Sequence, residues 1–303
     1  MLLHDGKELK AMIPQSKKAA LQHALSIGAA LLLVAGIASS AHAGDYSKSF
    51  TVANRANVHV DTNDGSVNII TSADVKQVEF HVDYAGYEID KNLHIDSQQS
   101  GDNVTLTARI KNGWHFTIGE LRRLRIEVRM PADADLRVET GDGSIKAANL
   151  TGTVDLHSGD GSLTVSSIKG SLTIRTGDGG IDASDIDGKI SAVSGDGHIT
   201  IEGRLDVLQA KSGDGRIKVR ALKGSKLDAS WSVSSGDGSV EVAVPSDLSA
   251  DIDAHSGDGS VSTEVPLTVQ GTISKNQVRG KLNGGGQMLT IHTGDGAIRL
   301  KAV

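Results

Sequence analysis

The sequence predicts an all-β protein: a single-stranded parallel β-solenoid, that is, a β-helix or β-roll, with coils of about eighteen residues. Two observations support this prediction. The motif Ser/Thr-Gly-Asp-Gly occurs eight times, and its first five copies are spaced by eighteen residues. Apolar and polar residues alternate on both sides of each copy, which is the pattern of half-buried strands. Each coil is therefore expected to contain two short strands.

Each Gly-Asp-Gly is expected to form a corner between these strands. The inward-facing phase of the alternation shifts across the tripeptide, which requires a corner or bulge there. Glycine suits a corner that needs positive φ, and an aspartate carboxylate can accept hydrogen bonds from nearby backbone N–H groups. A second corner is expected at the glycines in the middle of the coils. We therefore interpret eight aspartates as structural corners: Asp142, Asp160, Asp178, Asp196, Asp214, Asp237, Asp258 and Asp295.

Residues 1–43 have the pattern of a signal peptide for export. Four lysines precede an apolar run from Ala24 to Ala38, and Ala41-His42-Ala43 offers a small-x-small cleavage site. We expect a periplasmic, cell-surface or extracellular protein without a stable membrane span after signal removal, and a retained membrane anchor is the alternative. The chain has no cysteine, which excludes disulfides and a lipid-modified cysteine.

Residues 44–135 are expected to form degenerate coils and a cap, continuous with the regular coils of residues 136–303. Most of the aromatic residues lie in this first part. Because a solenoid needs atypical terminal coils to close its core, capping explains them simply. The alternative is a ligand-binding surface formed by Tyr84, Tyr87, Trp114 and Phe116.

The repeat becomes irregular after Asp214. The last gap, between Asp258 and Asp295, is close to two coils long, and we place a degenerate coil there. Three histidines stand three residues before a repeat aspartate, at His157, His255 and His292, and a shared zinc site is the alternative that they raise. We expect intervening coils to separate them, so that no metal site is predicted.

No catalytic motif is present: the sequence has no His-Glu-x-x-His, no Gly-x-Ser-x-Gly, no phosphate-binding loop and no cysteine nucleophile. We therefore predict neither an enzyme nor a cofactor. One alternative is a carbohydrate-active β-helix, a polysaccharide lyase or hydrolase, for which Arg122, Arg123 and Arg125 are the candidate basic residues. The other is a cation-binding spacer with metal ions bridging the aspartates of stacked coils, about 4.8 Å apart. The formal net charge of −6 argues against the binding of polyanions, and we expect no nucleic-acid partner.

Proline followed by a strand and Ser/Thr-Gly-Asp recurs, and the chain closes with Leu282-Asn283-Gly284-Gly285-Gly286 and Thr293-Gly294-Asp295-Gly296-Ala297-Ile298. This pattern resembles the bacterial putative-adhesin family, the domain of unknown function 4097, over roughly residues 50–303. The resemblance implies a β-solenoid, adhesin-like protein, and the family offers no catalytic residues to transfer. We therefore expect a non-catalytic cell-envelope module whose partner is an envelope protein or polysaccharide.

Overall fold

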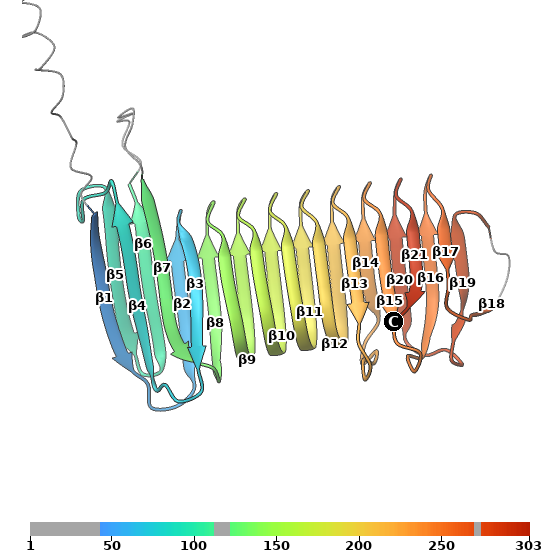
Figure 1. Cartoon of the computed structure of the whole chain (residues 1–303), viewed down its shortest axis with the longest axis horizontal. Coiled ribbons are helices and arrows are strands. Elements are labelled where there is room, and N and C mark those ends of the chain that lie inside the picture. Colours follow the sequence, from blue (N-terminus) through green and yellow to red (C-terminus); the bar gives the residue numbers. More distant parts are fainter. Residues whose placement is uncertain (1–42, 112–121, 270–273) are drawn as a thin grey trace, which may run out of the picture. The chain divides into compact units, whose positions relative to one another are not determined.

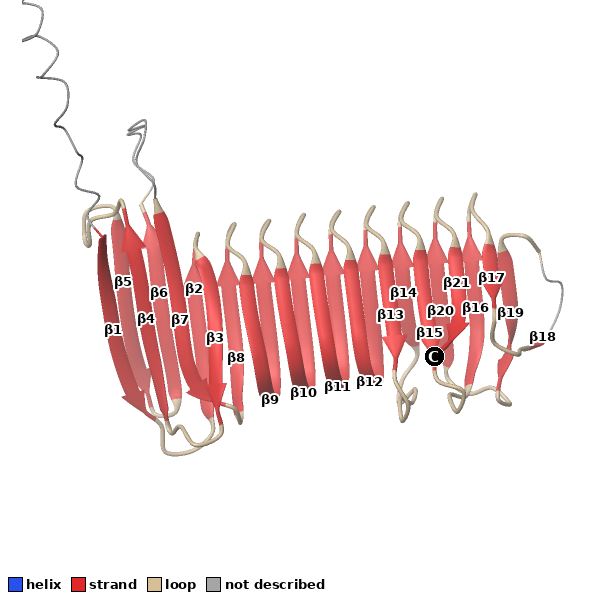
Figure 2. Ribbon diagram, in the orientation of Figure 1, coloured by secondary structure: helices blue, strands red, loops and turns tan. Residues whose placement is uncertain are grey.

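The computed structural model describes residues 43–111, 122–269 and 274–303 of the chain. These residues form an all-β structure in which every strand belongs to one open 21-stranded sheet (Figure 2). No helix occurs among them, so the prediction of an all-β protein is confirmed. None of this part of the chain could therefore cross a membrane as an apolar helix. The expected signal peptide, residues 1–43, lies outside the described residues apart from Ala43.

The strands fall into three groups along the sequence (Figure 1). The first group is β1 (Ala43–Thr51), β2 (Ala56–Thr62), β3 (Ser66–Ser72), β4 (Gln77–Ala85), β5 (Leu93–Ser100), β6 (Asn103–Ile110), β7 (Arg123–Pro131) and β8 (Ala134–Thr140). The central group is β9 (Ile145–Ser158), β10 (Leu163–Thr176), β11 (Ile181–Ser194) and β12 (Ile199–Ser212). The last group is β13 (Ile217–Ala221), β14 (Trp231–Ser235), β15 (Val240–Val244), β16 (Ala250–Ser256), β17 (Val261–Thr263), β18 (Thr268–Val269), β19 (Gln277–Leu282), β20 (Met288–Thr293) and β21 (Ile298–Ala302).

The four central strands pair side by side in parallel. Along β9 and β10 each residue faces the residue eighteen positions later, so that Ile145 lies beside Leu163 and Val154 beside Leu172. Burial alternates along each strand, and the inward apolar residues form one continuous core. A Gly-Asp-Gly lies in each bend between consecutive central strands.

The two halves of each central strand belong to two different faces. The first halves pair in a row that continues through β13, β15, β21 and β17, which we name face 1. The second halves pair in a row with β8, β14, β20 and β16, which we name face 2. The apolar core lies between the inward-pointing residues of both faces.

The glycines of the Gly-Asp-Gly motif are required by close stacking. None of those in the central motifs has positive φ, so the expectation that the motif needs a left-handed conformation is wrong here. A Cβ atom added at Gly161 would lie 2.0 Å from the carbonyl oxygen of Gly143, and one at Gly159 would lie 2.6 Å from that of Gly141. Successive bends therefore approach so closely that no side chain fits between them.

A buried hydroxyl, rather than the aspartate carboxylate, satisfies the backbone of each bend. Ser158 Oγ donates to the carbonyl oxygen of Gly143 at 2.9 Å and accepts from the N–H of Gly161 at 2.9 Å. The same hydroxyl contacts recur at Ser194 and Ser212. The aspartates of the motif are exposed instead. The expectation that the aspartate carboxylate accepts the backbone hydrogen bond of its own bend is therefore wrong. The hydroxyl of the Ser two residues earlier accepts it instead.

The first strands depart from the predicted all-parallel arrangement. β1 pairs with β4, β4 with β7, and β5 with β6, all antiparallel. The pair β2 and β3, joined through Asn63-Asp64-Gly65, is parallel to its neighbours and lies between β6 and β7 on one side and β8 and β9 on the other (Figure 1). The antiparallel strands cover this end of the core, which parallel coils alone would leave open.

The last strands are not stacked in sequence order. β20 pairs with both β14 and β16, and β21 with both β15 and β17, so the C-terminal pair of strands is inserted before β16 and β17 (Figure 1). β19 returns antiparallel to β16. The expectation of a degenerate coil lying between the motifs of Asp258 and Asp295 is therefore wrong, because the two motifs are neighbours in space.

Candidate functional site

The aromatic residues of the first strands do not form an exposed surface in the described part of the chain. Tyr87 is only 5% exposed and belongs to the core, where burial raises the pKa of its hydroxyl. Tyr84 is half-buried against the core. Trp114 and Phe116 lie outside the described residues. The guanidinium of Arg122 lies 5.8 Å from the centre of the Tyr87 ring, whereas Arg123 and Arg125 are exposed on β7. Tyr87 is therefore a core residue, which fits the expected capping of this end better than the alternative of a binding surface.

The structure brings two of the three histidines together. His255 and His292 lie side by side on β16 and β20, with ring centres 5.6 Å apart, so the expectation that a coil separates them is wrong. His157 lies on β9, several strands away. Among the described residues no three His, Cys, Asp or Glu side chains are grouped as a metal site would require. The exposed aspartates of the bends likewise form no such group.

A shallow groove lies at the second bend of the central strands and has a volume of about 560 Å³. We name it the glycine groove, after Gly152, Gly170 and Gly188, which lie side by side on its floor. Gly170 has a φ of 124°, and a Cβ there would lie 2.4 Å from the carbonyl oxygen of Gly152. The floor therefore has to be bare backbone, with about 10 Å between its first and third glycines.

Polar side chains flank the floor on both sides. Thr151, Lys169 and Asp187 are neighbours along one side, and Thr153, Ser171 and Lys189 along the other. Both lysines are exposed, and neither forms an ion pair with any described residue. The middle of the groove therefore offers hydroxyl groups and two ammonium groups that are available to a ligand.

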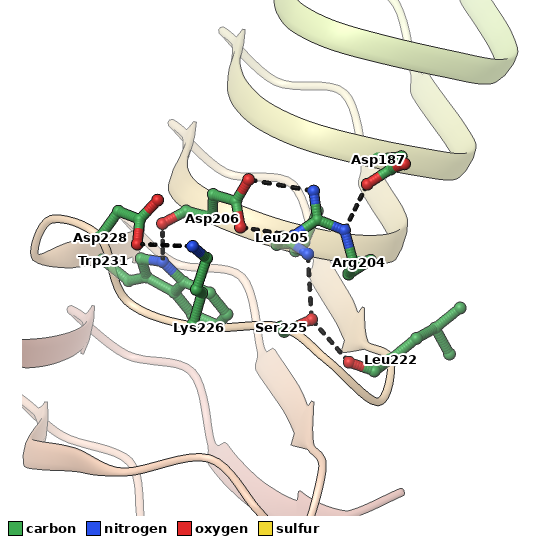
Figure 3. A network of polar contacts seen from close by, with 9 residues as sticks. All are labelled: Asp187, Arg204, Leu205, Asp206, Leu222, Ser225, Lys226, Asp228 and Trp231. Atoms are coloured by element: carbon green, nitrogen blue, oxygen red, sulfur yellow. Dashed lines mark hydrogen bonds and ion pairs between the residues drawn. The ribbon is translucent and has the colours of Figure 1, made fainter.

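A salt-bridged arginine, Arg204, stands at one end of the groove, and Figure 3 shows its contacts with Asp187 and Asp206. A register shift in β12 places Leu205 beside Gly188, so the glycine floor stops there. Arg204 binds Asp206 through two hydrogen bonds of 2.5 and 3.0 Å and also contacts Asp187. These hydrogen bonds, led by those of Asp206, raise the pKa of Arg204 above its ordinary value. The guanidinium is thus fixed in place and remains charged.

The loop after β13 forms hydrogen bonds with the backbone at this end of the groove. Ser225 Oγ accepts from the N–H of Leu205 at 2.9 Å and donates to the carbonyl oxygen of Leu222 at 2.6 Å (Figure 3). The indole N–H of Trp231 donates to the carbonyl oxygen of Asp206 at 3.3 Å. These contacts hold the backbone on which Arg204 and Asp206 stand.

A second arginine closes the opposite end. Arg55 contacts Asp133, binds Asp135 at 3.1 Å, and donates to the carbonyl oxygen of Thr151 at 2.9 Å. Burial alone would raise the pKa of Asp135, but hydrogen bonds from Arg55 and from the N–H of Thr153 outweigh burial and lower it. Each end therefore combines one cation with two carboxylates, and the charges of the whole groove nearly cancel.

The charged groups at the two ends of the groove are engaged with one another. The carboxylates at both ends are held by arginines: Asp133 and Asp135 by Arg55, and Asp187 and Asp206 by Arg204. The second bend could be predicted at these glycines from the sequence. The groove could not, because only the stacking of separate coils brings Arg55 and Arg204 to its two ends. The sequence signal that could have indicated the groove is the spacing of Gly152, Gly170 and Gly188, which recur every eighteen residues.

The profile of the family described as Toastrack DUF4097 matches residues 56–301. The chain therefore belongs to this family, which confirms the resemblance to the domain of unknown function 4097. No curated protein matches the chain.

Several solved structures are distantly similar. A "putative cell adhesion protein" from Clostridium sporogenes is 14% identical, with 86% of this chain and 100% of that chain covered and a TM-score of 0.30. A "putative adhesin" from Bacteroides fragilis is 11% identical, with 86% and 97% covered and a TM-score of 0.37. A "putative lipid binding protein" from Parabacteroides distasonis is 12% identical, with the same coverage as the second and a TM-score of 0.42.

Proposed function

We propose that this protein is a non-catalytic, exported cell-envelope β-solenoid that acts as an adhesin-like interaction module. On this proposal its coils have about eighteen residues with Gly-Asp-Gly corners, residues 1–43 are a signal peptide, and residues 44–135 cap the regular coils. The pairing of residues eighteen positions apart supports the architecture. The leader pattern of residues 1–43 supports export.

The proposed ligand is a segment of an envelope polysaccharide, bound in the glycine groove. The observation that carries this proposal is the bare glycine floor between rows of hydroxyl and ammonium groups. A flat floor without side chains admits an extended chain, and hydroxyl and ammonium groups hydrogen-bond to the hydroxyls of sugars. Because the charges of the groove nearly cancel, an uncharged glycan fits it better than a strongly acidic one.

The test is retention of uncharged envelope and storage glycans by the purified protein, compared with two variants. Lys169→Ala combined with Lys189→Ala removes the two available ammonium groups, and retention is expected to fall about tenfold. Lys146→Ala is the matched control, since Lys146 is an exposed lysine on face 1, outside the groove. Equal retention by all three proteins would refute binding in the groove.

The same incubations separate binding from catalysis. A binding module retains the polymer unchanged, whereas a lyase would release unsaturated oligosaccharides and a hydrolase would release shorter reducing chains. Release of either product would overturn the non-catalytic assignment. Failure to retain any glycan would overturn the polysaccharide as ligand and leave the envelope protein as the partner to test by pull-down.

A further inference from the structure

Face 1 carries a second polar surface that is strongly basic. We name it the basic patch and define it by five residues of β13, β21 and the bend before β13: Arg216, Lys218, Arg220, Arg299 and Lys301. β15 lies between β13 and β21, because Lys218 pairs with Glu241 and Glu241 with Arg299. Such a concentration of positive charge contrasts with the formal net charge of −6 of the chain.

The patch is hollow along its middle. β15 presents Ala243, and the bends beside it present Ser239 and Ala297, all of them small residues. A depression of about 240 Å³ is lined by Arg216, Ser239, Val240, Glu241, Ala297 and Arg299. An adjoining depression of about 380 Å³ has Lys218 and Arg220 on its wall. Since β13 and β21 are two strand spacings apart, about 10 Å, Arg216 and Arg299 stand on opposite sides of the first depression.

Three of the five cations have no anionic partner. Arg220 lies 3.5 Å from Glu202, and Lys301 lies 3.2 Å from Glu241. Arg216, Lys218 and Arg299 are exposed and form no ion pair with any residue that the structure describes. The five cations of the patch outnumber the two carboxylates beside them, Glu202 and Glu241, and this excess of positive charge favours an anionic ligand.

The insertion of the C-terminal strands creates this patch. If the strands were stacked in sequence order, β17 would lie beside β15 and would place Ser262 next to Glu241. β21 instead occupies that position and β17 lies beyond it, with Ser262 paired to Arg299. Two cations of the patch therefore come from a strand about eighty residues away from the other three in the sequence.

We propose that the basic patch binds an acidic glycan, with one carboxylate or sulfate group held between Arg216 and Arg299. Guanidinium groups bind planar and tetrahedral oxyanions through paired hydrogen bonds. The unpaired cations are few and their backbone positions are spaced by about 7–12 Å, which suits a polymer with one charge every sugar or two. Nucleic acid fits less well, because its phosphates are much denser and the described outward residues of β13, β15 and β21 include no aromatic ring for base stacking.

The proposal is independent of the glycine groove, and its test uses different probes. Binding of polygalacturonate and dextran sulfate to the purified full chain is measured at low salt, with uncharged dextran, single-stranded DNA and phosphatidylglycerol vesicles in parallel. Acidic glycans are expected to bind, with affinity falling as salt is added. Arg216→Gln combined with Arg299→Gln should weaken binding about tenfold or more. Arg175→Gln on face 2 is the matched control and should not weaken it.

A further variant is expected to strengthen the binding of acidic glycans. Glu241 lies inside the patch, so Glu241→Gln removes its negative charge and frees Lys301, and acidic glycans should bind several-fold more tightly. The groove variants Lys169→Ala and Lys189→Ala should leave this binding unchanged. Three outcomes would overturn the proposal: no binding of either acidic glycan, equal binding by the Arg216 and Arg299 variant, or binding of DNA or vesicles as tight as that of the glycans.

Discussion

Replacing Gly161 by alanine tests whether close stacking of the bends determines the glycines of the repeat. The new Cβ would lie 2.0 Å from the carbonyl oxygen of Gly143, a backbone atom that cannot rotate away. Real Cβ contacts are essentially never shorter than 3.0 Å, so the two bends would have to separate by about 1 Å. That movement would stretch two hydrogen bonds that join these bends beyond hydrogen-bonding distance: the bond from Ser158 Oγ to the carbonyl oxygen of Gly143, at 2.9 Å, and the bond from the N–H of Asp160 to the carbonyl oxygen of Gly141, at 3.2 Å.

Two lost hydrogen bonds at about 1–1.5 kcal/mol each amount to about 2–3 kcal/mol of unfolding free energy. Equilibrium urea denaturation measures this loss. The control is Gly101→Ala, because Gly101 has a φ of 64° and nothing within 4 Å of its added Cβ. Its cost is conformational only, about 1 kcal/mol. If Gly161→Ala costs no more than Gly101→Ala, the bends are not packed as described.

The remaining predictions concern the same bends and the Arg55 end of the groove. Ser158→Ala should cost about 1–3 kcal/mol in urea denaturation because it leaves the N–H of Gly161 unsatisfied, whereas Ser158→Thr should be nearly neutral; equal losses would contradict the role of the hydroxyl. Asp160→Asn should be nearly neutral with or without millimolar calcium, and a calcium-dependent stabilisation that this variant abolishes would favour a cation-binding spacer. The pKa of Asp135 is lower in the folded protein than its ordinary 3.8, so its stabilisation is present above pH 3.8 and is lost as the pH falls through the folded value. Asp135→Asn should accordingly reduce the acid dependence of the melting temperature below pH 4, and an unchanged dependence would refute this contribution.

The repeat and its buried positions could be predicted because they follow from local patterns. Alternation around each motif identifies which residues point inward, and the eighteen-residue spacing identifies which residues become neighbours. Strands β9, β10 and β11 agree with this residue by residue, whereas the pairing of β11 with β12 is shifted by one residue from Ile186 to Gly188. The reason for the glycines was mistaken, since φ and steric crowding both select glycine and the sequence cannot distinguish them.

The order of the terminal strands could not be predicted from the same patterns. A strand that returns antiparallel, as β19 does beside β16, has the same alternation as a parallel one. Insertion of β20 and β21 before β16 and β17 leaves no local trace either, because every coil carries the same motif. Both consequences of this insertion, the stacking of His255 on His292 and the basic patch, were therefore missed.

The alternative of an aromatic binding surface does not fit Tyr87, and two of its other residues, Trp114 and Phe116, lie outside the described residues. Aromatic residues usually indicate a sugar-binding surface when they are exposed, but Tyr87 is buried in the cap. The glycine groove depends instead on residues from separate coils, with Arg55 and Arg204 at its ends. The sequence contained the column of glycines but not the information that the arginines stand at either end of it.

The central claim, that a glycan lies in the glycine groove, is tested most directly by protection from chemical labelling. The chain contains no cysteine, so Lys169→Cys and, as the control, Lys146→Cys each introduce a single reactive thiol. The rate of maleimide labelling is measured with and without a saturating amount of the retained glycan. We predict that the glycan slows labelling at position 169 about tenfold while position 146 is unaffected, and equal rates at position 169 with and without glycan would contradict the account.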